Sequence, residues 1–285
     1  MSLFDRLVEE VLKENHELYD LRPVVEKELL HHEILRIMSE GGYLRYLTFM
    51  GGTCLRNCYS SPRMSEDLDF TGGVDFTREL MEDMGDEIVR TISRKYDAHV
   101  DVGEPQQESG DTKTWKIRVD TQPSRPDISS QRIHIDICML ASHEIKPAML
   151  KNRYGVELGT SGLILNVESR EEILADKYVA LALRPNRVKF RDIWDIMWLS
   201  RNSVDVKPSL IAQKLQERGV HKSTYIEKLR NRVSSIADAH DGFLFELRRF
   251  LPQHTVEHDL ENPAYWEVVM TTLREAYAEF VEYAE

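Results

Sequence analysis

Cysteine is scarce in this chain of 285 residues, which holds only Cys54, Cys58 and Cys138. An odd and low number of cysteines argues against a disulfide framework and favours a reducing compartment, so we expect a cytoplasmic protein. Cys54 and Cys58 lie one helical turn apart, but no second cysteine pair or nearby histidine completes a zinc set. We therefore interpret the cysteines as small buried hydrophobic residues.

Long apolar runs are also missing, since none approaches the ~20 residues that cross a bilayer, and we expect no membrane partner. The first ten residues alternate charged with apolar side chains, which favours a helix over a signal peptide. The sequence contains no Gly-x-Ser-x-Gly, HExxH, Walker or dinucleotide-binding motif. It therefore gives no support to the hydrolase, zinc-protease and nucleotide-binding classes that those motifs mark.

Positive charge is outnumbered, because the formal net charge is −12. Such a field opposes a nucleic-acid backbone, so a polyanionic partner would have to bind a local basic surface. Two stretches are candidates for that surface, and a solvated helix surface is the alternative, which we favour for the second. They are Arg184, Arg187, Lys189 and Arg191, and then Arg230, Arg232, Arg248 and Arg249.

Hydrophobic periodicity predicts an α+β fold, with strands clustered before a helical second half. We expect a domain of N-terminal helices over 1–40, an α/β core over 41–167 and a helical domain over 168–285. Strands are predicted at 44–50, 67–71, 98–102, 113–120, 132–138 and 162–167, with polar loops at 106–112 and 121–131. Helices are predicted at 3–19, 22–40, 53–59, 77–96, 169–184, 190–202, 207–218, 222–250 with a possible break near Asp241-Gly242, and 262–284. His31 and His32 are expected on a helix surface.

The glycine pair Gly51-Gly52, followed by Thr53, opens one of these helices. Glycines allow a close approach of the backbone to a phosphate, and the first N–H groups of a helix attract anions. The Thr53 hydroxyl can cap the helix or donate to a phosphate oxygen, and Arg56 on the first turn could reach the same anion. A simple tight turn is the alternative for a glycine pair alone.

Asp67 and Asp69 follow closely and project to the same side of a strand, because residues i and i+2 share a face. Carboxylates this close repel each other unless a cation lies between them, and hard oxygen ligands suit Mg²⁺. An exposed pair of edge-strand acids is the alternative. Alternating isoleucines at 133–137 place Asp136 on one face of a later strand, where it could be a third metal ligand or a general base.

These motifs resemble the AbiEii/AbiGii toxin family of nucleotidyltransferases, within the DNA-polymerase-β-like superfamily. The resemblance rests on Gly51-Gly52-Thr53, on the segment Arg63 to Phe70 and on Asp136. It implies a nucleotidyltransferase-like mixed sheet with a C-terminal helical bundle. It also implies Mg²⁺ or Mn²⁺ at Asp67, Asp69 and Asp136, and an NTP substrate.

Two downstream elements extend the resemblance. Lys177 lies in an otherwise apolar helical segment, and Asp192 and Asp195 lie three apart on one helical face. They resemble the lysine and the RDxxD segment of that family, in which Lys177 would bind the triphosphate and Asp192 would orient Lys177 or touch the nucleotide. A structural ion pair between two helices is the alternative.

The predicted function is therefore metal-dependent transfer of NMP from an NTP to an acceptor hydroxyl. The resemblance implies a toxin of a bacterial toxin–antitoxin or phage-defence system, with tRNA as the acceptor and an antitoxin as a partner. Two alternatives stay open: a nucleotide-binding module without turnover, and NMP transfer to a protein hydroxyl.

Overall fold

The computed structural model describes residues 2–105, 110–122, 129–185 and 187–285. The chain divides into two compact units, Met1–Glu168 and Ser169–Glu285. The helices before residue 40 belong to the same unit as the sheet. Parts of the predicted loops 106–112 and 121–131 lie outside the described residues.

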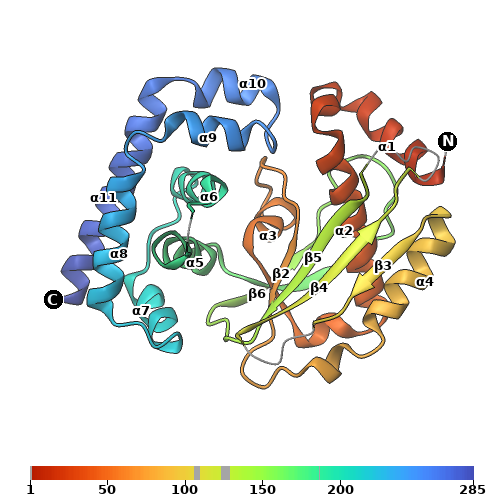
Figure 1. Ribbon diagram of the computed structural model, residues 1–285, viewed down its shortest axis with the longest axis horizontal. Coiled ribbons are helices and arrows are strands. Elements are labelled where there is room, and N and C mark those ends of the chain that lie inside the picture. The colour runs from red at the N-terminus through yellow and green to blue at the C-terminus, as the bar shows by residue number, and fades with distance from the viewer. Residues whose placement is uncertain (1, 106–109, 123–128, 186) are drawn as a thin grey trace. The chain divides into compact units, whose positions relative to one another are not determined.

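A seven-stranded sheet runs through the first unit in the order β3-β4-β5-β2-β1-β7-β6 (Figure 1). Strand β2 pairs in parallel with β5, and β1 with β7, while the other pairs are antiparallel. The predicted α+β class with a mixed sheet is therefore confirmed. The strands are β1 (Thr48–Met50), β2 (Leu68–Thr71), β3 (Val100–Gly103), β4 (Thr112–Val119), β5 (Gln131–Cys138), β6 (Ile145–Met149) and β7 (Ile164–Glu168).

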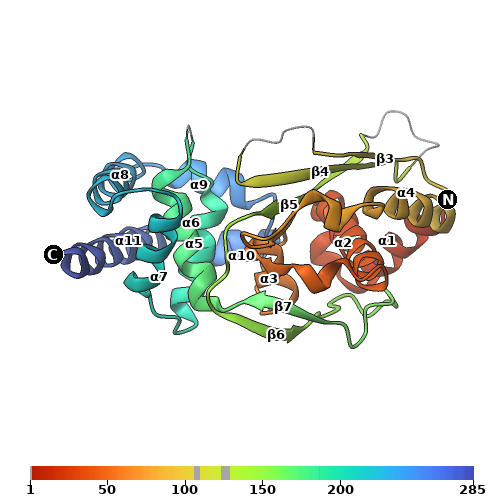
Figure 2. The same cartoon turned by 90° about the horizontal axis from the view of Figure 1, so that it is seen from below.

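Helices cover one face of the strands β3 to β5, which we call the inner face (Figure 2). Trp115, Ile117, Ile133 and Ile135 are almost completely buried there, whereas the residues between them in sequence point to the opposite, outer face. Burial of such side chains stabilises the unit by roughly 1.5–3 kcal/mol each. The helices of this unit are α1 (Leu3–Glu14), α2 (Arg22–Glu40), α3 (Gly51–Asn57) and α4 (Met84–Tyr96), with 3₁₀ turns η1 (His16–Leu21), η2 (Tyr43–Tyr46) and η3 (Arg78–Met81).

The second unit is helical, as predicted, and the aromatic side chains of Tyr225, Phe243 and Phe280 are buried in it among many aliphatic ones. The break expected near Asp241-Gly242 instead falls between α8 and α9. Gly242 lies inside α9, where a Cβ atom would be 3.1 Å from the Phe190 ring, so glycine permits close packing there. The helices are α5 (Arg170–Leu183), α6 (Phe190–Arg201), α7 (Pro208–Glu217), α8 (Lys222–Ser235), α9 (His240–Leu247), α10 (Gln253–Thr255), the π-helical η4 (Val256–Leu260) and α11 (Pro263–Ala284). No described helix has both the length and the apolar character to cross a membrane.

The structure departs from the predicted strands in two places. The segment 44–50 is strand only from Thr48, because Gly42 adopts φ +75° and starts the 3₁₀ turn η2. The prediction also missed β6, an exposed edge strand that contains Pro147. An edge strand tolerates proline and needs no buried face, so neither hydrophobic alternation nor β-propensity marks it.

His31 and His32 are buried rather than on a surface, with exposed fractions of 0% and 1%. The ring of His32 contacts Thr160 through Nδ1, 2.8 Å from Oγ1. Burial lowers the pKa of His32 to about 4 and also lowers the pKa of His31. Both rings are therefore neutral at pH 7, because the low-dielectric surroundings disfavour the imidazolium.

Acidification is expected to destabilise the first unit through His32. Below the unfolded pKa of about 6.5 the unfolded chain takes up a proton that the folded chain does not accept until pH 4. Between pH 7 and 5 the free energy of unfolding should fall by about 2 kcal/mol more in the wild type than in His32→Gln. Urea unfolding followed by circular dichroism measures this difference, and equal losses in the two proteins would contradict it.

Candidate active site

The pairing of β2 with β5 brings two of the predicted acids together. Asp69 and Asp136 are direct partners in this parallel pair, so their side chains leave the same outer face. Leu68 and Phe70, on either side of Asp69, are buried at 0% and 1% exposure and fix the orientation of the strand. The predicted alternation around both acids is therefore present.

Asp67 lies one residue before β2, and three contacts hold it there. Its Oδ1 accepts a hydrogen bond from the backbone N of His134 at 3.1 Å, and the Nδ1 of that imidazole is 3.3 Å away. The Thr53 hydroxyl donates to the Asp67 carbonyl. Thr53 is completely buried. Its hydroxyl therefore connects α3 to the Asp67 backbone, whereas the sequence had suggested a helix cap or a bond to a phosphate.

Thr114 of β4 is a site residue that sequence reasoning missed. It lies directly opposite Asp136 across the β4–β5 pair, and its hydroxyl donates to Asp136 Oδ1 at 2.6 Å. This bond restricts the rotation of the Asp136 carboxylate. The predicted strand 113–120 contained Thr114, but only the register between strands makes the two residues neighbours.

The glycine pair leaves space for two side chains of the site. Gly51 has φ +73°, and a Cβ atom there would be 2.7 Å from Asp69 Oδ2. A Cβ atom on Gly52 would be 2.4 Å from Nη2 of Arg63. The glycines thus let α3 begin directly against the Asp69 carboxylate and the buried Arg63, whether or not a phosphate also binds there.

Arg56 does not occupy the predicted position, and this assignment is corrected. Arg56 is 5% exposed, and its guanidinium lies 3.0 Å from Glu28 Oε1 and donates to the carbonyl of Pro62 at 2.9 Å. Tyr154 donates to the same Glu28 carboxylate. A buried carboxylate requires a paired cation, so Arg56 is committed to Glu28 and cannot also serve as a nucleotide ligand.

Helix α2 holds the segment that leads into Asp67. Glu28 accepts from the backbone N of Ser65 at 3.3 Å, and Lys27 forms an ion pair with the Glu66 carboxylate at 2.8 Å. One turn further, His31 Nε2 contacts the Glu66 carbonyl at 2.9 Å. Because β2 begins only at Leu68, these contacts and not strand pairing fix the backbone just before the first acid.

The three acids share one face but are not drawn into a tight cluster. Within the described residues, the oxygens of Asp67, Asp69 and Asp136 do not all lie within 4.8 Å of one another. Three like charges repel, so closer convergence requires a cation between them. The donors are carboxylate oxygens on partly exposed side chains, which is the ligand chemistry of Mg²⁺ and Mn²⁺.

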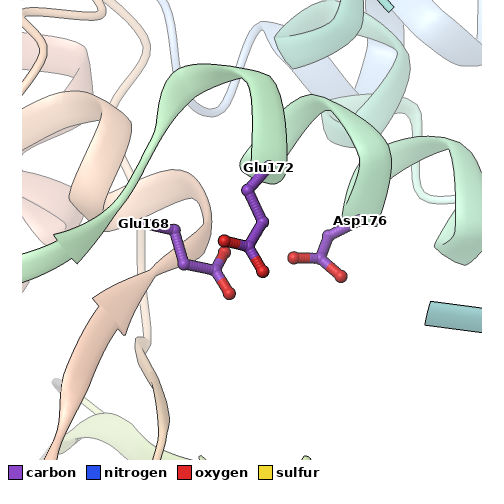
Figure 3. A group of neighbouring side chains, drawn as sticks. All are labelled: Glu168, Glu172 and Asp176. Carbon is purple, nitrogen blue, oxygen red and sulfur yellow. The ribbon is translucent and has the colours of Figure 1, made fainter. Parts of the chain in front are cut away.

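A different group of acids does meet that spacing: Glu168, Glu172 and Asp176 (Figure 3). Glu172 and Asp176 lie one turn apart on α5. The buried ammonium of Lys214 is 2.9 Å from Glu172 Oε1 and 2.9 Å from Asp176 Oδ2. Lys214 already supplies positive charge between these two acids, so we assign no metal to this group.

In the second unit, Lys177 pairs with both acids of the predicted segment. Its Nζ lies 2.7 Å from Asp192 Oδ1 and 2.8 Å from Asp195 Oδ2, and Arg184 lies 2.7 Å from Asp192 Oδ2. Burial raises the pKa of Asp192, but Lys177 and Arg184 outweigh it and lower this pKa to about 2. The ion pair fits both an orienting role for Asp192 and a purely structural one, so nucleotide contacts of Lys177 and Asp192 stay predictions.

A mixed sheet that carries acids on neighbouring parallel strands, beside a helix opened by two glycines, defines a nucleotidyltransferase. The AbiEii family, described as a nucleotidyl transferase toxin of type IV toxin–antitoxin systems, matches residues 33–272. The chain belongs to this family. Membership implies an NTP substrate and an antitoxin partner.

Solved structures resemble the chain at low sequence identity. A Helicobacter pylori protein described as a candidate nucleotidyltransferase is 13% identical, with 92% of this chain and 98% of that chain covered and a TM-score of 0.51. MenT4, a nucleotidyltransferase toxin from Mycobacterium tuberculosis, is 15% identical, with 95% and 97% covered and a TM-score of 0.49. The first likeness concerns the fold alone. No curated protein matches the chain.

Proposed function

We propose that this protein transfers NMP from an NTP to an acceptor hydroxyl, with pyrophosphate as the leaving group, and requires Mg²⁺ or Mn²⁺. The observation that carries the proposal is the direct pairing of Asp69 with Asp136, with Asp67 on the same side, next to Gly51. Such a reaction depends on the positioning of the two substrates and on the neutralisation of phosphate charge. It therefore needs few protein groups that react themselves.

The carboxylates of Asp67, Asp69 and Asp136 would hold the metal, because they offer hard oxygen donors. When bound, the metal would neutralise phosphate charge and lower the pKa of the attacking hydroxyl. Asp136 would accept the proton of that hydroxyl, and the 2.6 Å hydrogen bond from Thr114 would orient its carboxylate. The backbone N–H of His134 donates to Asp67 Oδ1 and holds that side chain against β5.

For the biological role we propose a toxin whose acceptor is tRNA. Family membership supports a toxin paired with an antitoxin, and the tRNA assignment rests on the resemblance of the motifs to nucleotidyltransferase toxins. A phage-defence role and a cytoplasmic location belong to the same proposal.

Removal of divalent metal is expected to abolish transfer. The test incubates the protein with each α-³²P-labelled NTP, Mg²⁺ and total RNA, with and without EDTA, and follows the label on a gel. Label on RNA that is lost with EDTA and restored by excess Mg²⁺ or Mn²⁺ supports the proposal. Transfer that is insensitive to EDTA would contradict the metal requirement.

The same assay separates the alternatives. Nucleotide binding without transfer to RNA or protein would favour a regulatory module. Label on proteins of a cell lysate, and not on RNA, would assign a protein hydroxyl as the acceptor.

A further inference from the structure

The outer face of strands β4 and β5 carries a row of basic side chains next to the acids. The row consists of Lys116, Arg118, Arg132 and His134, and we call it the basic ladder. Lys116, Arg118 and Arg132 are exposed, and the His134 side chain is 42% exposed. Helices α1, α2 and α4 lie on the other side of these strands (Figure 2). The ladder therefore leaves the face of these strands opposite to those helices.

The register places basic side chains opposite one another. Arg118 faces Arg132, a pair of like charges, and Lys116 faces the His134 imidazole, at successive positions that lead to Asp136. Directly opposed like charges destabilise a sheet, since their Cβ atoms are only about 5 Å apart. Folding alone gives no reason for this arrangement, whereas a bound polyanion does.

Little of the charge of the lysine and the two arginines is neutralised inside the protein, whereas the His134 imidazole lies 3.3 Å from Asp67 Oδ1. Arg118 makes a 3.5 Å contact with Asp101, and both side chains are about half exposed, so the pair is weak. In the part of the chain that the structure describes, neither Lys116 nor Arg132 forms an ion pair. The ladder is thus a local basic surface on a protein with a net charge of −12.

The basic residues singled out in the sequence are differently placed. Arg184 pairs with Asp192, Arg191 lies 3.4 Å from Glu246, and Arg248 lies 2.7 Å from Glu261. Arg232 donates to two backbone carbonyls. The charges of these four arginines are used within the second unit, which makes them weaker candidates for a polyanion.

We propose that the basic ladder binds the sugar–phosphate backbone of an RNA acceptor and directs its reacting hydroxyl to Asp136. The proposal rests on the transferase activity proposed above. Residues on one face of a strand are spaced by about 6.6 Å, so Arg132 lies roughly 13 Å from Asp136 along β5. Arg132, at the far end of the ladder, can therefore contact only an acceptor that extends several nucleotides from the reacting end. We therefore expect the protein to discriminate between RNA acceptors by their length.

The experiment measures RNA binding in the full chain, without turnover. Fluorescence anisotropy with a 5′-fluorescein-labelled 20-nucleotide RNA is recorded over a range of KCl concentrations. We expect Lys116→Gln/Arg132→Gln to bind roughly tenfold more weakly at low salt and to reduce the salt slope by about two. Arg94→Gln removes an exposed charge from α4 and should bind as the wild type does.

A transfer assay supplies the second readout. Labelling of long RNA should fall in the double variant, while labelling of a nucleoside acceptor should match the wild type, because a nucleoside has no phosphate for Lys116 or Arg132 to bind. Equal RNA affinity in the double variant and Arg94→Gln would overturn the proposal that the basic ladder binds RNA. So would absence of RNA binding by the wild type, or label on protein alone. Because anisotropy requires no chemistry, a protein that binds RNA through the ladder but transfers nothing refutes only the proposed function.

Discussion

Asp69→Asn is expected to lower NMP transfer by roughly 10³-fold or more. The substitution keeps the size of the side chain but removes the charge at the position that pairs with Asp136. Metal stabilisation of transition-state charge contributes several kcal/mol, and each 1.36 kcal/mol corresponds to a tenfold change in rate. The rate of label transfer from α-³²P-NTP at saturating Mg²⁺ measures the effect.

Asp86→Asn is the matched control, because Asp86 is an exposed acid at the start of α4 in the same unit. It should transfer label at the wild-type rate. Circular dichroism and the urea midpoint establish that Asp69→Asn is folded, and loss of repulsion among the acids should leave its stability at or above that of the wild type. A folded Asp69→Asn with undiminished transfer would exclude Asp69 from the chemistry.

Gly51→Ala is expected to reduce transfer by at least roughly 10²-fold. Gly51 has φ +73°, which costs alanine about 1–2 kcal/mol. The new Cβ atom would also lie 2.7 Å from Asp69 Oδ2, so the carboxylate or the start of α3 must move. A displacement near 1 Å at a reacting centre is enough for a loss of this size.

Gly73→Ala separates the backbone effect from the displacement of Asp69. Gly73 has a similar φ of +75°, but no atom lies within 4 Å of the position that its Cβ would occupy. It should lose stability comparable to the backbone share of Gly51→Ala and retain most of the transfer activity. Equal activity losses in the two variants would show that the space beside Asp69 is unimportant.

The sequence predicted much of this architecture because its signals are local. Alternating apolar residues identified the faces of β2 and β5, and the glycine pair marked the start of α3. The family resemblance and the α+β class were confirmed. The exposed edge strand β6 gave no periodic signal, and the buried pair His31-His32 looked like a polar surface, because sequence alone does not show what packs against a helix.

Arg56 illustrates the limit most clearly. From the sequence it lay one turn from the glycines and could reach an anion, but its partner Glu28 is 28 residues away and buried on α2. Thr114 illustrates the opposite error, since nothing local distinguishes it from other strand threonines. Both outcomes depend on contacts between distant segments.

By itself the sequence indicated the class of enzyme through its resemblance to a known family, and it placed the candidate acids on their strand faces, because short-range spacing fixes those faces. The tertiary structure decided which groups meet: Asp69 beside Asp136, Thr114 on Asp136, Arg56 on Glu28, and the basic ladder along β4 and β5. Strand register and helix packing set these encounters, and both arise from burial across the whole unit and not from neighbouring residues.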